Sequence, residues 1–221
     1  MPVIYNAIET MPIMDMPMGF PTSYAQIKEM TMLYSCAMRE ICTKLENLSQ
    51  EFELNKSRNP IQHITHRLKR LESIRLKMLQ RSLPLEYEIM RDEITDIAGI
   101  RVICSYITDI YAIAEMLKQQ DDVLVVREKD YIANPKPNGY RSYHMIVAIP
   151  IFLSSEKQII PVEIQMRTIA MDFWASLEHQ LRYKTEADVP ESVRARLTGI
   201  AENIFHADLE MQQIYEEISL L

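Results

Sequence analysis

Apolar residues recur at steps of three and four along a long stretch near each end of the chain. Over residues 23–52 this spacing predicts an amphipathic helix that buries one face. The apolar positions of this helix are Ile27, Met30, Tyr34, Ala37, Ile41, Leu45, Leu48 and Phe52. Pro190 opens the second stretch, where apolar residues alternate steps of four and three over about four heptads. We call its positions the heptad seam: Val193, Leu197, Ile200, Ile204, Ala207, Met211, Ile214, Ile218 and Leu221. The seam either packs on the first helix or joins subunits, and two such flanking helices favour a homo-oligomer.

Helix and strand patterns alternate between these two ends. Asn59-Pro60 is typical of a helix start, and an apolar stripe predicts that this helix runs to about Arg81. The stripe consists of Ile61, Ile64, Leu68, Leu71, Ile74 and Met78. The elements expected next are a short helix over 85–94, a strand over 97–106, a helix from a Thr108 cap to about Gln120, strands over 122–132, 143–152 and 158–167, and a helix over 168–184. This order predicts an α/β fold, an α+β mixed sheet with helices packed on it.

The strand expected over 158–167 contains the stretch VEIQMRT, residues 162–168, in which apolar and polar side chains alternate. A period of two gives a strand one apolar and one polar face. Glu163, Gln165 and Arg167 would then share the polar face. Because the strand lies between apolar runs, we interpret this face as lining a cleft rather than as simply solvated.

The stretch KDYIANPKPNGYRSYHMIV, residues 129–147, begins as a strand, breaks at Pro135–Gly139 and resumes as a strand. Proline and Asn-Gly favour a turn, because they restrict φ and supply a positive φ. Tyr140, directly after the turn, can stack on a base. Four nearby side chains can contact phosphate or base oxygens: Lys129, Lys136, Arg141 and His144. A β-hairpin with a polar tip is the alternative interpretation.

Composition narrows the function classes. The 221 residues correspond to one large or two small domains. The net charge of −7 argues against a general nucleic-acid coat, although basic residues gather within residues 67–81. The four glycines form neither G-x-G-x-x-G nor G-x-x-x-x-G-K, so lysine and arginine side chains would have to hold phosphates. Three cysteines without a C-x-x-C pair fit a reducing cytoplasm. We expect no membrane span, and a disordered Met- and Pro-rich arm over residues 1–22.

Three motifs carry a resemblance to a known family: DIAGIRVI over residues 96–103, KPNGYRSYH over 136–144 and VEIQMRT over 162–168. In this order they resemble the synthetase domain of the RelA/SpoT family. The chain is similar to a stand-alone small alarmone synthetase of the RelP/RelQ type, with the synthetase domain over 23–187 and a packing or oligomerisation helix over 188–221. The resemblance implies a nucleotidyltransferase-like fold with flanking N- and C-terminal helices, and a tetramer.

The resemblance also implies an activity. Enzymes of this family transfer pyrophosphate from ATP to the 3′-hydroxyl of GDP or GTP, which gives ppGpp or pppGpp and AMP. We therefore expect a GTP diphosphokinase of the stringent response. No His-Asp dipeptide occurs in the chain, so the hydrolase half of long RelA/SpoT enzymes is missing and no alarmone hydrolysis is expected.

Site residues follow from the same resemblance. On the ATP side, Arg67 and Arg101 would sandwich the adenine, and three residues would contact the triphosphate: Lys69, Ser73 and Lys77. On the guanine-nucleotide side, Tyr140 would be the platform for the base. Its partners would be Lys129, Lys136, His144 and Gln165. Asp96 and Glu163 would be catalytic residues that hold Mg²⁺, with Glu163 also accepting the proton of the attacking hydroxyl. Asp172 stands where the family often has Asn near the guanosine.

Two other functions fit the same fold. The first is a catalytically silent guanine-nucleotide sensor, although binding alone would not require both Asp96 and Glu163. The second is a regulator that binds single-stranded RNA through the basic residues of 67–81 and Tyr140. RNA could equally regulate a catalytic chain, so single-stranded RNA stands beside ATP and GDP or GTP as an expected partner.

Overall fold

The computed structural model describes residues 24–55, 58–184 and 190–220. These residues form two compact units, one with residues 24–32 and 70–94, the other with 33–69 and 95–220. The arm expected over residues 1–22 lies outside the described residues. No helix in the described part of the chain is long and apolar enough to cross a membrane.

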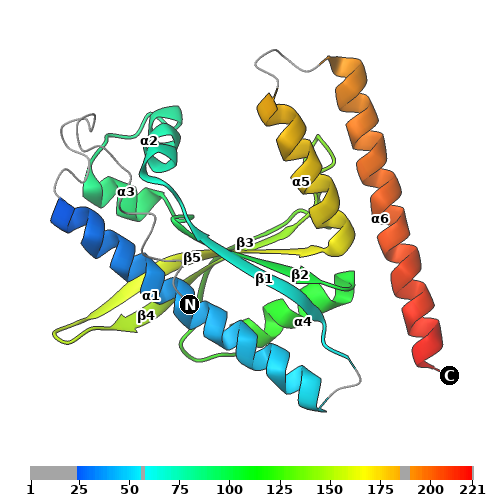
Figure 1. The fold of residues 1–221 in the computed structure, drawn as a ribbon, viewed down its shortest axis with the longest axis horizontal. Helices are drawn as coiled ribbons and strands as arrows, with labels where there is room; N and C mark the ends of the chain where they lie inside the picture. The colour runs from blue at the N-terminus through cyan, green and yellow to red at the C-terminus, as the bar shows by residue number, and fades with distance from the viewer. Residues whose placement is uncertain (1–23, 56–57, 185–189, 221) are drawn as a thin grey trace. The chain divides into compact units, whose positions relative to one another are not determined.

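The described residues form six helices and five strands (Figure 1). In chain order they are α1 (Tyr24–Asn55), β1 (Ile61–Leu68), α2 (Leu71–Gln80), α3 (Tyr87–Glu93), β2 (Ala98–Cys104), α4 (Ile107–Lys118), β3 (Leu124–Asp130), β4 (Tyr143–Phe152), β5 (Lys157–Thr168), α5 (Ile169–Lys184) and α6 (Glu191–Ser219). The predicted mixed α/β fold is confirmed, and most of the expected elements lie where the sequence places them.

One predicted helix is wrong in its first half. Residues 61–68 form the strand β1, and the helix begins only at Leu71. Ile61, Ile64 and Leu68 have helical spacing, but only Ile61 is fully buried, and polar residues occupy both faces of the strand. β1 pairs antiparallel with β2. A helix at this place would leave the backbone groups along that edge of β2 without their ladder partners, which is costly in a buried setting.

The start of α4 also differs from the prediction. Tyr106, not Thr108, is the N-cap residue, and the helix begins at Ile107. The carboxylate of Asp109 accepts a hydrogen bond from the Tyr106 N–H at 3.1 Å. An acid in the third helical position therefore stabilises this end, as in a capping box.

The five strands form one mixed sheet in the order β1-β2-β5-β4-β3. β2 and β5 are parallel, and the other neighbours are antiparallel. The register places Ile100, Ile164 and Met145 side by side on one face, where all three are buried. α4 packs on β2 and β5 and buries its own Ile110 and Leu117. This apolar face is the core of the larger unit.

α5 follows β5 directly, and α6 packs along α5 and on α4 (Figure 1). Pro190 is the N-cap residue of α6, as the sequence predicts. Ala201 is the one fully buried residue among those described on α6. Much of the heptad seam is exposed in the single chain: Val193, Ile200, Met211, Ile214 and Ile218. The buried face of α6 is therefore offset from its seam.

Candidate active site

One row of side chains crosses the other face of the sheet. The register aligns five residues, one from each strand: Thr65, Arg101, Gln165, His144 and Lys129. We call them the polar row. Neighbouring strands lie about 5 Å apart, so these side chains stand next to one another. Four of the five were predicted as site residues from motifs up to 64 positions apart (165 − 101), and the sheet brings them together.

A pocket of about 240 Å³ lies at the β1–β2–β5 part of this face. Its lining is Thr65, His66, Arg67, Asp96, Gly99, Ile100, Arg101, Glu163 and Gln165. The structure thus gathers both predicted carboxylates and both predicted adenine-binding arginines in one pocket. Arg67 and Glu163 flank Gly99 in the register, and the missing side chain at Gly99 leaves space between them.

The two carboxylates meet because β2 and β5 are parallel neighbours. Asp96 lies two residues before β2, and Glu163 lies within β5 opposite Gly99. Lys69, directly after β1, forms a 2.5 Å ion pair with Asp96, and both side chains are mostly buried. The predicted phosphate-binding Lys69 therefore lies beside one of the predicted metal ligands.

Glu163 is held as a carboxylate by its neighbours. His144 Nδ1 lies 3.4 Å from Glu163 Oε1, and Gln165 Nε2 donates a 2.9 Å hydrogen bond to Oε2. Burial acts to raise the pKa of Glu163, but the hydrogen bonds from His144 and Gln165 outweigh it and lower the pKa below its usual value. The charge of Asp96 acts in the opposite direction, as expected for two acids that share a site.

This donor set fits Mg²⁺. Magnesium is usually held by one or two carboxylates together with substrate phosphates. Asp96 and Glu163 supply two carboxylates in one pocket, and the lowered pKa keeps Glu163 charged. The described residues contain no cluster of three or more His, Cys, Asp or Glu that would form an all-protein metal cage. Asp96 and Glu163 are therefore the two carboxylates of this pocket that could hold such an ion.

Tyr140 belongs to an aromatic and basic cluster at the other end of the polar row. Its hydroxyl lies 2.9 Å from His144 Nε2 and accepts a 2.8 Å hydrogen bond from Arg167 Nη2. Tyr131 meets both rings edge-on. Lys136 Nζ lies 4.6 Å from the centroid of the Tyr140 ring. A chain of contacts thus runs from the predicted base platform through His144 to Glu163.

Two more residues belong to this site: Arg167, which has no assigned role in the sequence analysis, and Asp172, which only the resemblance places near the guanosine. Arg167 contacts Tyr140 and also donates a 3.3 Å hydrogen bond to Gln165. Asp172 accepts a 2.9 Å hydrogen bond from Arg167 and lies 3.2 Å from Arg101 Nη1. Burial, followed by the charge of Arg167, lowers the pKa of Arg101, and Asp172 opposes this. The alternation of VEIQMRT did place Arg167 on the polar face, and this was the signal that could have identified it.

Other predicted site residues are placed differently. Lys129 is exposed at the β3 end of the polar row. Ser73 and Lys77 lie four residues apart on α2 and therefore on one helix face. α2 belongs to the smaller unit, so the roles of these two residues stay predictions.

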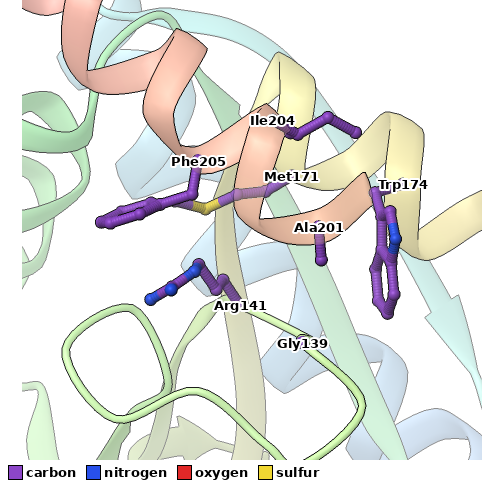
Figure 2. A pocket seen from close by; sticks show the side chains of 7 residues that line it. All are labelled: Gly139, Arg141, Met171, Trp174, Ala201, Ile204 and Phe205. Carbon is purple, nitrogen blue, oxygen red and sulfur yellow. The ribbon is translucent and has the colours of Figure 1, made fainter. Parts of the chain in front are cut away.

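Arg141 does not lie on the polar face, contrary to the prediction that it contacts phosphate or base oxygens. It is buried, donates a 2.6 Å hydrogen bond to the Ile132 carbonyl, and pairs with Glu202 of α6 at 3.2 Å. Figure 2 shows its guanidinium beside Phe205, whose ring centroid is 3.7 Å away. The sequence gives no periodic signal inside a loop, so it could not separate Arg141 from Tyr140.

Comparison with known proteins agrees with this geometry. A family model described as the region found in RelA / SpoT proteins matches residues 66–188. The chain is 43% identical to GTP pyrophosphokinase YwaC of Bacillus subtilis, over 86% of this chain and 91% of the relative. It is 40% identical to GTP pyrophosphokinase YjbM of the same organism, over 84% of this chain and 86% of the relative.

Solved structures agree as well. Small alarmone synthetase 1 from Bacillus subtilis bound to its product pppGpp matches with a TM-score of 0.81 and 39% identity, over 87% of this chain and 98% of the other. The same enzyme bound to AMPCPP matches with a TM-score of 0.76 and 34% identity, over 89% and 100%. Because the family model covers more than half of the chain and the two curated relatives align over most of their length, the chain belongs to the RelA/SpoT family.

Proposed function

We propose that this protein transfers pyrophosphate from ATP to the 3′-hydroxyl of GDP or GTP and releases AMP with ppGpp or pppGpp. The observation that carries the proposal is the polar row, which joins a carboxylate pocket to the Tyr140 cluster across one sheet face. Relatives named GTP pyrophosphokinase, and a related synthetase bound to pppGpp, support the same reaction.

The reaction has a simple balance. The 3′-oxygen of the guanine nucleotide attacks the β-phosphorus of ATP, a new P–O bond forms, and the bond from the β-phosphorus to the α,β-bridging oxygen breaks. AMP leaves with that oxygen. The proton of the 3′-hydroxyl goes to Glu163, a carboxylate within the pocket. Such positioning, together with fixed charge, is the main source of catalysis in phosphoryl transfer.

The donor nucleotide would bind at the β1–β2 side of the pocket. Arg67 and Arg101 present guanidinium groups from adjacent antiparallel strands, two residues apart in register. Guanidinium planes stack well on aromatic rings, which suits an adenine between them. Lys69 would contact the triphosphate beside Asp96. For Ser73 and Lys77 of α2, a triphosphate contact is proposed from the resemblance alone.

The acceptor nucleotide would bind at the β4–β3 side. Tyr140 offers a ring to the guanine, with Lys136 and Lys129 as cations for its phosphates. His144 and Gln165 both contact Glu163 and would orient the ribose toward it. In this proposal the attacking hydroxyl would lie between the base platform and the two carboxylates.

Asp96 and Glu163 are the residues that would hold Mg²⁺. When bound, the ion neutralises developing charge on the phosphate oxygens. The lowered pKa of Glu163 makes it a good ligand and a weak base. We propose that Glu163 has two roles: its charge helps to hold the ion, and its carboxylate accepts the proton of the attacking hydroxyl.

The decisive experiment incubates the chain with ATP, GDP or GTP and magnesium, and separates the nucleotides by anion exchange. Equal amounts of AMP and ppGpp or pppGpp are expected. Nucleotide binding without any AMP would instead support the catalytically silent sensor. Salt-dependent retention of single-stranded RNA without AMP formation would support the RNA-binding regulator.

Four further expectations belong to the proposal. We propose a cytoplasmic protein, supported by the absence of a disulfide among Cys36, Cys42 and Cys104. The exposed heptad seam supports a homo-oligomer, which the resemblance implies to be a tetramer. Single-stranded RNA is proposed as a regulator. The synthetase domain is proposed to end at residue 187, before the packing or oligomerisation helix of residues 188–221.

A further inference from the structure

The loop between β3 and β4, residues 131–142, lies directly against α6. We call it the β3–β4 loop. Gly139 has a φ of +86°, and a Cβ built on it would lie 2.6 Å from the Cβ of Ala201. The pocket that remains beside these residues has a volume of about 10 Å³, hardly enough for one water molecule (Figure 2). The loop backbone and the helix are therefore in tight contact.

Arg141 ties the loop to the helix from the same side. Its side chain is 9% exposed and reaches three groups, the Ile132 carbonyl, the Glu202 carboxylate and the Phe205 ring. The bond to Ile132 joins the two ends of the loop. The pair with Glu202 and the stacking on Phe205 join the loop to α6.

Further contacts surround this arginine. Asn138 of the loop donates a 3.2 Å hydrogen bond to Glu178 of α5. Trp174 of α5 donates a 3.0 Å hydrogen bond to the Leu197 carbonyl of α6 and packs with Ala201 in a small apolar cluster. Tyr140 packs against that same cluster. The ring proposed to bind the base is therefore supported from behind by α5 and α6.

We propose that Arg141 and Glu202 are positioning residues of the guanine-nucleotide site, and that α6 fixes the β3–β4 loop so that Tyr140 is ready to receive the base. The proposal rests on the proposed function, because it deepens the role of Tyr140. A loop held in its binding conformation loses less conformational freedom on binding than a free one. Among the described contacts, Arg141 touches neither the polar row nor the carboxylate pocket of about 240 Å³. Its effect is therefore exerted through Tyr140.

A purely structural role makes a different prediction. Loss of a purely structural ion pair would lower the melting temperature. It would weaken the binding of both nucleotides equally or leave both unchanged. If the two residues position Tyr140, their loss should weaken binding of the guanine nucleotide alone. The donor-side residues Arg67 and Arg101 lie on β1 and β2, and none of the described hydrogen bonds and ion pairs joins them to the β3–β4 loop.

The test is a double-mutant cycle of Arg141→Gln, Glu202→Gln and the pair. Calorimetry measures the Kd of GDP and of a non-hydrolysable ATP analogue for each variant, and Tm is recorded alongside. Glu202→Gln should weaken GDP binding roughly twofold to tenfold, since the carboxylate is partly exposed and its ion pair is screened. The ATP analogue should keep its Kd. The double variant should bind GDP no worse than Arg141→Gln alone, because the two residues act as one unit.

Glu210→Gln is the matched control, since Glu210 is an exposed acid on the same helix. An unchanged GDP Kd in Glu202→Gln, or an equal loss for both nucleotides, would overturn the proposal. If Arg141→Gln does not fold, Glu202→Gln alone decides. Turnover is assayed separately: a wild-type chain that binds GDP but forms no AMP refutes the proposed reaction, whereas the Kd comparison still judges the positioning role.

Discussion

At the scale of single residues, Tyr140 offers the most selective test of the acceptor site. Its ring packs on the Trp174–Ala201 cluster, and its hydroxyl meets His144 and Arg167. Stacking of a base on an aromatic side chain contributes about 1–3 kcal/mol. Tyr140→Ala should therefore raise KM for GDP roughly 5- to 150-fold, with KM for ATP little changed.

Steady-state kinetics with each nucleotide varied in turn would check this prediction. Tyr140→Phe is the matched control, because it keeps the ring and removes only the hydroxyl contacts. A comparable rise in KM for ATP would show that Tyr140 is not selective for the guanine nucleotide and would contradict the assignment.

The two carboxylates give a second prediction. Asp96→Asn removes a charged ligand from the pocket, and Glu163→Gln keeps the shape of the side chain while removing its charge. Both should abolish turnover, since loss of a proton acceptor alone costs about 10²–10⁴-fold and weaker magnesium binding adds to it. Guanine nucleotide should still bind, because Tyr140 is unchanged. If either variant forms AMP at more than roughly a tenth of the wild-type rate at saturating magnesium, that residue does not have its proposed role as metal ligand or proton acceptor.

The depressed pKa of Glu163 has a consequence for pH. A carboxyl whose pKa is lower in the folded state stabilises the fold above its unfolded pKa, and this contribution is lost as the pH falls through the folded value. Urea unfolding would measure the free energy of unfolding of wild type and of Glu163→Gln. The part of their difference that depends on charge should persist at pH 6 and fade below about pH 4, the ordinary carboxyl range. A difference that fades between pH 6 and 5 would mean that Glu163 titrates above its usual range.

The predicted residues of the pocket were identified mainly through the resemblance to the RelA/SpoT family, and local pattern supported only those on the strand of VEIQMRT. The period of two in VEIQMRT placed Glu163 and Gln165 on one face, and the register confirms it. Arg141 was misplaced because a loop has no period. The pairing of Asp172 with Arg101 could not be foreseen, since it depends on how α5 turns after β5.

At the scale of elements, β1 shows where periodicity misleads. Its apolar residues stand three and four apart, yet the segment completes the sheet as an edge strand. An edge strand that carries a polar site on one face need not alternate cleanly, because little of it is buried. Central strands such as β5 are buried on one face and so keep a readable pattern. Pattern therefore failed at the β1 edge, whereas the strand at the other edge, β3, was predicted correctly.

The β3–β4 loop gives the prediction at this scale. Gly139 adopts a left-handed φ of +86°, which costs other residues about 1–2 kcal/mol. Gly139→Ala also forces a Cβ into Ala201. We expect weaker GDP binding by calorimetry, with partial recovery in Gly139→Ala combined with Ala201→Gly, which removes the clash but not the backbone strain.

Gly199→Ala is the control for this pair, because an added Cβ at Gly199 meets nothing within 4 Å. It should leave GDP binding unchanged. Full recovery in the double variant would mean that the left-handed backbone contributes nothing, and no recovery would mean that the contact with Ala201 is not the cause.

At the scale of the whole molecule, the exposed heptad seam predicts self-association. Ile200 is 46% exposed and Met211 54%, and both lie on the same side of α6 because they are eleven residues (211 − 200), about three turns, apart. A long row of exposed apolar residues on a helix marks an interface.

Neither Ile200 nor Met211 belongs to the cluster that supports Tyr140. Ile200→Asp combined with Met211→Asp should therefore dissociate the oligomer without removing the fold. Light scattering coupled to size exclusion measures the mass, and circular dichroism confirms the helix content. Gln213→Asp, exposed on α6 outside the seam, should keep the wild-type mass. A wild-type chain that is monomeric at micromolar concentration, or a double variant of unchanged mass, would show that the seam does not join subunits.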